Sequence, residues 1–138
     1  GNIGNKKVFA IKPLTFMNNS GICIRELIEY FKIETEDVIV FHDDLDIDFG
    51  KIKAKFGGSS AGHNGIDSLD KFIGKDYSRV RIGIGKPNGK ANVVDHVLKD
   101  FDEEEKQQLE SITKTIVDSL TILLDKKLEL FSSTVNNK

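Results

Sequence analysis

The spacing of apolar residues along the chain predicts alternating strands and helices. Four strands are predicted from apolar or alternating runs, at residues 8–11, 38–41, 51–56 and 79–84. Helical periodicity predicts helices at residues 22–31, 64–73 and 102–131. Strands that alternate with helices favour an α/β fold. We expect residues 1–138 to form one domain in which helices flank a mixed, twisted β-sheet.

The same pattern predicts which faces are buried. Residues 38–41 are continuously apolar, which is typical of a strand buried on both faces. Residues 51–56 alternate lysine with apolar residues, which indicates a half-buried strand. We expect Ser20 to cap the first helix and Cys23 to be buried in it, as core packing rather than as a nucleophile.

Composition narrows the class of protein. The chain has 138 residues, of which 38% are hydrophobic. No apolar run approaches the ~20 residues that a membrane helix needs, and we expect no signal peptide. The single cysteine excludes an internal disulfide and a cysteine-rich zinc site. We therefore expect a cytoplasmic protein with no membrane contact.

The net charge of −2 hides an asymmetry. Residues 51–90 carry nine lysines and arginines against three aspartates, a net of +6, whereas the rest of the chain carries −8. Period-two alternation places the side chains of Lys51, Lys53 and Lys55 on one strand face, and those of Arg79 and Arg81 on one face of another. These five cations either form one phosphate-binding patch or keep a solvated sheet edge from aggregating. The absence of interleaved aromatics favours folded RNA over stacked single strands as the partner of such a patch.

Acidic and imidazole side chains crowd the segment from 42 to 65, next to flexible glycines. They are His42, Asp43, Asp44, Asp46, Asp48 and His63. Such a cluster can hold Mg²⁺ or Mn²⁺, can satisfy turn amides, or can provide an acid that orients a histidine base. The sequence pattern leaves these three interpretations open.

Two asparagines lie beside this chemistry. The carboxamides of Asn18 and Asn64 can hold a substrate carbonyl or a water, or they can act as turn and cap residues. The glycines at 83, 85 and 89 resemble a dinucleotide fingerprint, but one residue too many precedes the last glycine. We discount that motif.

Four sequence blocks, in order, carry a resemblance to a known family. They are Lys-Pro-Leu-Thr-Phe-Met-Asn-Asn-Ser-Gly at 12–21, His-Asp-Asp-Leu-Asp at 42–46, the glycine-rich turn with Gly-His-Asn-Gly at 57–65, and Arg-Val-Arg-Ile-Gly-Ile-Gly-Lys-Pro at 79–87. Together they closely resemble bacterial-type peptidyl-tRNA hydrolase over essentially the whole chain. The resemblance implies an esterase that uses no metal or other cofactor and cuts the bond between a stalled peptide and the tRNA 3′ ribose. It also implies a cytoplasmic monomer that needs no protein partner and recognises the acceptor stem and 3′ end of peptidyl-tRNA.

The resemblance also implies roles for individual residues. Asp43 resembles the carboxylate that orients the catalytic histidine. Phe16 and Asn18 resemble residues that line the position of substrate and water. Asn64 resembles the carboxamide that holds the tRNA 3′ end and the attacking water, with His63 as a supporting catalytic neighbour.

Lys55 and Arg81 resemble the pair that clamps the tRNA 5′ phosphate. One departure from the family concerns the general base, because roughly fifty N-terminal residues of the family pattern, with its His-Asn pair, have no counterpart here. His42, His63 and His96 do not occupy the position of that base. We therefore expect an N-terminally truncated member that is nearly inactive by itself, although the intact protein is active.

Two alternatives remain at this point. A non-catalytic RNA-binding relative would keep the phosphate clamp and lack the general base. A metal-dependent hydrolase would instead use the acidic cluster from Asp43 to Asp48.

Overall fold

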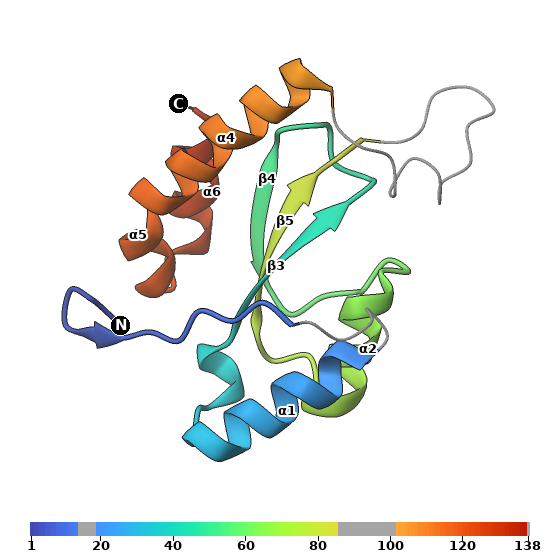
Figure 1. Cartoon of the computed structure of the whole chain (residues 1–138), viewed down its shortest axis with the longest axis vertical. Coiled ribbons are helices and arrows are strands. Elements are labelled where there is room, and N and C mark those ends of the chain that lie inside the picture. Colours follow the sequence, from blue (N-terminus) through green and yellow to red (C-terminus); the bar gives the residue numbers. More distant parts are fainter. Residues whose placement is uncertain (14–18, 86–101, 138) are drawn as a thin grey trace. The chain divides into compact units, whose positions relative to one another are not determined.

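The computed structural model describes residues 1–13, 19–85 and 102–137 (Figure 1). Its elements, in chain order, are β1 (Asn2–Ile3), β2 (Lys6–Lys7), α1 (Ser20–Phe31), the 3₁₀ turn η2 (Thr35–Asp37), β3 (Ile39–Asp44), β4 (Ile52–Phe56), α2 (Asn64–Ile73), β5 (Ser78–Gly83), α4 (Glu103–Asp118), α5 (Leu120–Leu124) and α6 (Leu128–Asn136). Phe16, Asn18 and His96 lie outside the described residues. No helix in the described ranges is long and apolar enough to cross a bilayer.

β5 is the central strand of a three-stranded sheet with the order β3-β5-β4. It runs parallel to β3 and antiparallel to β4. The backbone hydrogen bonds that set these directions are Ser78 to Val38 (3.0 Å) and Ile84 to Asp44 (3.0 Å) on the β3 side, and Gly57 to Tyr77 (3.0 Å) and Gly83 to Lys51 (2.8 Å) on the β4 side. The predicted α/β class with a mixed sheet is confirmed.

Contacts group the chain into two compact units, residues 1–40 with 55–79, and residues 41–54 with 80–138. In the first unit α1 and α2 lie side by side (Figure 1). Gly21 allows this approach, because a Cβ there would collide with the backbone of Ser68. The Gly21 amide donates instead to Ser68 Oγ at 2.9 Å. Ile66, Leu69 and Tyr77 form the core beneath these helices.

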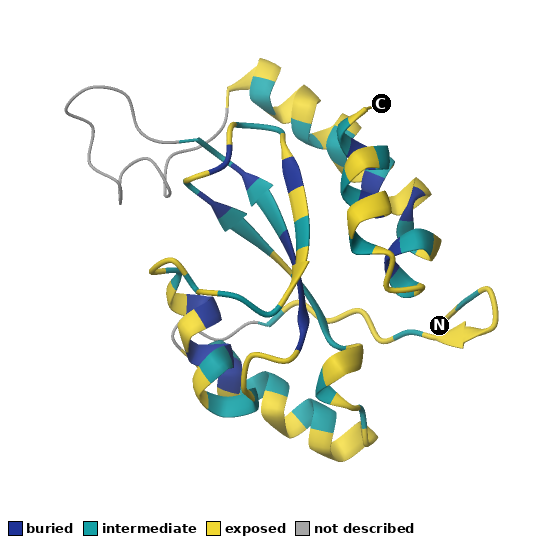
Figure 2. Ribbon diagram, turned by 180° about the vertical axis from the view of Figure 1, so that it is seen from behind, coloured by how far each residue is buried: buried dark blue, intermediate teal, exposed yellow. Residues whose placement is uncertain are grey.

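In the second unit the C-terminal helices each present a buried and an exposed face (Figure 2). The Asn136 side chain pairs with the backbone of Ile52, accepting at 3.0 Å and donating at 2.7 Å. Ser132 Oγ accepts from the Ala54 amide at 2.9 Å. These side chains satisfy backbone groups of β4 that the sheet leaves unpaired, so α6 protects a strand edge.

The first predicted strand, at 8–11, is wrong. Residues 8–13 have no regular secondary structure, and a two-residue hairpin of β1 and β2 precedes them. An apolar run forms a strand only where a partner strand offers hydrogen bonds. Within the described part of the chain, Phe9 instead stacks on Phe31, with ring centroids 4.4 Å apart.

Other local expectations also need correction. Phe41 is 43% exposed, so the strand predicted at 38–41 is not buried on both faces. Ser20 is the first residue of α1 and not its cap, and the N-cap residue Asn19 makes no side-chain capping bond. Cys23 is only partly buried. The segment 102–131 forms three helices rather than one, with breaks at Ser119 and near Lys126.

Candidate active site and phosphate-binding residues

His63 and Asn64 begin helix α2, directly after the glycine-rich turn. Nδ1 of His63 accepts hydrogen bonds from the amides of Gly65 at 3.1 Å and Ile66 at 3.2 Å, so His63 is the N-cap of the helix. An accepting Nδ1 leaves the ring hydrogen on Nε2 in this arrangement. Asn64 is exposed at the first helical position. Sequence reasoning missed the capping role, because Ser, Thr, Asp and Asn are the usual caps.

Asp43 is the penultimate residue of β3 and is half-buried. Its backbone oxygen accepts from Nδ1 of His42 at 2.8 Å. Asp43 belongs to the second unit, whereas His63 and Asn64 belong to the first.

Asp44 and Arg81 form an ion pair within the second unit. Oδ2 of Asp44 accepts from Nε of Arg81 at 2.7 Å, and Oδ1 accepts from the amide of Asp46 at 2.8 Å. The Asp44 side chain is 7% exposed, while that of Arg81 is 30% exposed. Arg81 is thus a partly solvated cation with a buried partner. Sequence reasoning placed Asp44 in an acidic cluster and did not predict this pair.

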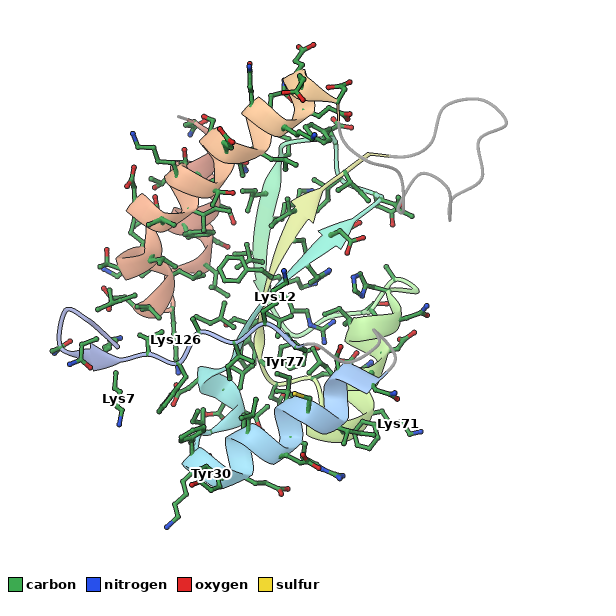
Figure 3. All side chains as sticks on the ribbon, in the orientation of Figure 1. Lys7, Lys12, Tyr30, Lys71, Tyr77 and Lys126 are labelled. Atoms are coloured by element: carbon green, nitrogen blue, oxygen red, sulfur yellow. The ribbon has the colours of Figure 1, made fainter. Side chains whose placement is uncertain are left out.

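Arg79 does not belong to a solvent-facing patch, which corrects the expectation of five surface cations. Its side chain is 2% exposed, and Nη2 donates to Asp70 Oδ1 at 2.8 Å. The hydroxyl of Tyr77, labelled in Figure 3, donates to the same oxygen at 2.8 Å. Burial, more than the hydrogen bond to Asp70, raises the pKa of Tyr77 well above its ordinary value. Alternation predicts which side of a strand a residue takes, but not what covers that side.

The three lysines of the 51–56 segment are exposed, as the half-buried pattern predicts. Ile52 between them is fully buried. The Nζ of Lys55 lies 3.6 Å from the position that a Cβ on Gly58 would take, so this ammonium lies over the glycine turn of its own unit. Lys51, Lys53 and Lys55 therefore remain available to an anionic partner.

Comparison with known proteins decides the family. The sequence model of the family "Peptidyl-tRNA hydrolase" matches residues 1–138. The chain belongs to the peptidyl-tRNA hydrolase family. A peptidyl-tRNA hydrolase of Pelagibacter ubique is 80% identical over 138 residues, which is 100% of this chain and 74% of that protein. One from Aliarcobacter butzleri is 54% identical over 112 residues, 81% of this chain and 61% of that protein.

Solved structures agree with this assignment. A crystal structure of a peptidyl-tRNA hydrolase variant from Acinetobacter baumannii matches with a TM-score of 0.89 at 31% identity, covering 99% of this chain and 69% of that one. The family resemblance and the fold class predicted from sequence are thereby confirmed. These relatives are named as hydrolases, so the non-catalytic alternative is not favoured.

The chain spans 74% of the length of the Pelagibacter relative and 69% of the Acinetobacter chain. These matches do not support the expected loss of an N-terminal segment from this family member. Its organisation as one domain also stays a prediction.

The metal-dependent alternative gains no support from the acidic segment. Across residues 1–13, 19–85 and 102–137, no three His, Cys, Asp or Glu side chains come together as a metal site. Asp44 is engaged by Arg81 and by the Asp46 amide. The role that the resemblance assigns to each residue stays a prediction.

Proposed function

We propose that this peptidyl-tRNA hydrolase family member hydrolyses the ester bond between peptide and tRNA, which releases the tRNA for reuse in translation. The observation that carries the proposal is the family match over residues 1–138, with 80% identity to a relative that bears this name. The proposal also includes a monomer in the cytoplasm that requires no protein partner and no cofactor. Sedimentation of the purified protein at several concentrations tests the monomer.

Asp43, Asn64 and His63 are proposed to contribute to the chemistry. A carboxylate can orient a histidine and stabilise its protonated form, so that the imidazole accepts a proton from water. We assign that task to Asp43, whose place near the end of β3 supports it. The exposed carboxamide of Asn64 is assigned to the tRNA 3′ end and the attacking water, and His63 holds the start of α2 on which Asn64 stands. Phe16 and Asn18 are assigned to lining the substrate position.

Lys55 and Arg81 are proposed to bind the 5′ phosphate at the acceptor stem. Phosphate contacts supply much of the affinity of proteins for nucleic acids and fix the bound register. Both cations are at least partly solvent-exposed, whereas Arg79 is buried. This difference supports assigning the phosphate to Lys55 and Arg81 and not to Arg79.

The test of the catalytic proposal is turnover of peptidyl-tRNA by the natural protein that carries this sequence, with a chelator present. Asp43→Asn keeps the shape of the side chain and removes its charge. We expect hydrolysis to fall by about a hundredfold or more, within the range of general-base catalysis. Asp48→Asn removes the same charge from an exposed residue and should leave turnover near that of the unaltered protein.

The outcomes separate the hypotheses. Equal activity of the Asp43→Asn and unaltered proteins would contradict the role of Asp43. Salt-sensitive tRNA binding without any turnover by the unaltered protein would contradict the proposed hydrolysis and favour a binding role. Loss of activity with the chelator alone would favour the metal-dependent alternative.

A further inference from the structure

We propose that Asp44 is a positioning residue, which holds the guanidinium of Arg81 in the one orientation that presents its two terminal nitrogens to a phosphate. The inference rests on the proposed function, since it deepens the role assigned there to Arg81. It concerns selectivity for a terminal phosphate rather than the general attraction of the protein for RNA.

Asp44 can position Arg81 because hydrogen bonds hold Asp44 itself in place. Asp44 is the last residue of β3, and its backbone oxygen accepts from Ile84 at 3.0 Å, which ties it to the neighbouring segment. Its side chain is 7% exposed, and Oδ1 accepts from the Asp46 amide at 2.8 Å. A buried carboxylate held at one oxygen offers the other oxygen in a defined direction.

Arg81 uses its inner nitrogen for this contact. Nε donates to Oδ2 at 2.7 Å, a short, charge-assisted hydrogen bond. Because the guanidinium is planar, a bond at Nε sets the plane and direction of both Nη groups. The side chain keeps 30% of its surface exposed. Two donors in a fixed plane match the oxygens of a phosphate, whereas a freely rotating side chain must be ordered on binding.

A carboxylate beside an RNA-binding arginine weakens the positive potential that attracts the whole polyanion. An acid at this place therefore opposes general affinity, and its contribution is to geometry. This contrast gives a signature that simple damage to the fold would not produce. Removing the charge of Asp44 should leave binding of RNA without a terminal phosphate equal or tighter, while the preference for the terminal phosphate falls.

The experiment measures binding of one deacylated tRNA in two forms, with a 5′-phosphate and with a 5′-hydroxyl, at several salt concentrations. The ratio of the two dissociation constants is the readout. Asp44→Asn can still accept from the Asp46 amide, but its amide group would face Arg81 Nε as donor against donor. We expect this ratio to fall about tenfold, the factor that one charge-assisted hydrogen bond is worth. Asp48→Asn, with the same change in charge on an exposed side chain, should keep the ratio.

Arg81→Gln separates this inference from the proposed function. If Arg81→Gln abolishes the phosphate preference and Asp44→Asn retains it, Asp44 does not position the arginine. The proposed binding of the phosphate by Arg81 would still hold. If Arg81→Gln also retains the preference, the proposed phosphate role of Arg81 fails, and the inference fails with it.

Arg81→Lys keeps the inference testable even if Asp44→Asn does not fold. Lysine keeps the charge but lacks the planar group that Asp44 orients. We expect loss of the phosphate preference with an unchanged salt dependence of binding to the 5′-hydroxyl form. A preference equal to that of the unaltered protein would overturn the inference, because charge alone would then suffice.

Discussion

Asp70→Asn tests the buried ion pair of the first unit. Asp70 Oδ1 accepts from both Arg79 Nη2 and the Tyr77 hydroxyl, each at 2.8 Å. Asparagine preserves the shape and one acceptor oxygen, but it leaves the guanidinium of Arg79 buried at 2% exposure without a counter-charge. Among the described residues, Nε and Nη1 of Arg79 already lack hydrogen-bond partners, so little else compensates that charge.

The magnitude follows from the burial of both partners. Asp70 is 11% exposed and Arg79 is 2% exposed, so solvent screens the pair only weakly. Removing one partner of a buried pair lowers the free energy of unfolding by ~3–5 kcal/mol. The Arg79 guanidinium carbon lies 4.6 Å from the centroid of the Tyr77 ring, and this cation–π contact remains in the variant. Because it still stabilises the charge, we expect a loss at the lower end of that range.

Urea unfolding followed by circular dichroism measures the loss. Asp76→Asn, which removes the same charge from an exposed residue before β5, is the matched control and should change the free energy of unfolding by less than ~0.5 kcal/mol. A double variant, Asp70→Asn with Arg79→Met, should recover much of the loss, since it removes the uncompensated buried charge and keeps an oxygen that accepts from the Tyr77 hydroxyl. A loss below ~1 kcal/mol for Asp70→Asn would refute the reasoning, because the buried charge would then be solvated by other means.

Three further predictions follow from the contacts of the first unit. His63→Ala should lower the free energy of unfolding by ~1 kcal/mol through loss of the α2 cap, and His63→Asn should restore it, as measured by urea unfolding; equal stability of all three proteins would contradict the capping role. Gly21→Ala should lower the free energy of unfolding by ~1–3 kcal/mol, because the added methyl group would collide with the Ser68 backbone. An unchanged melting temperature would contradict that close contact. The raised pKa of Tyr77 means that the folded state holds this proton more tightly, so its contribution to stability is present below the unfolded pKa of about 10 and declines as the pH rises further. Tyr77→Phe should reduce the decline in unfolding free energy above about pH 10, and an identical slope in both proteins would contradict the prediction.

Some elements could be predicted because the information that forms them is local. Helix α2 has the predicted bounds, since a glycine-rich turn ends where helical spacing of Ile66 and Leu69 begins. Strand β4 follows the alternation of lysines with buried Ile52. The C-terminal segment shows the limit of this reasoning. Its helical spacing of apolar residues continues through Ser119 and past Lys126, although the helix is interrupted at both places. Lys126 has a backbone φ of 62°, which is incompatible with a continuous helix. The spacing of apolar residues does not indicate such an interruption.

The sequence by itself determined the family, through four ordered blocks, and the alternation of strands and helices. Tertiary structure decided what Arg79 and Arg81 do. They stand two residues apart on β5 with the same local pattern, yet Arg79 is buried against Asp70 of α2 while Arg81 stays partly exposed beside Asp44 of β3. The physical reason is that alternation sets the direction of a side chain along its own strand. Burial and counter-charge come from segments far away in the sequence.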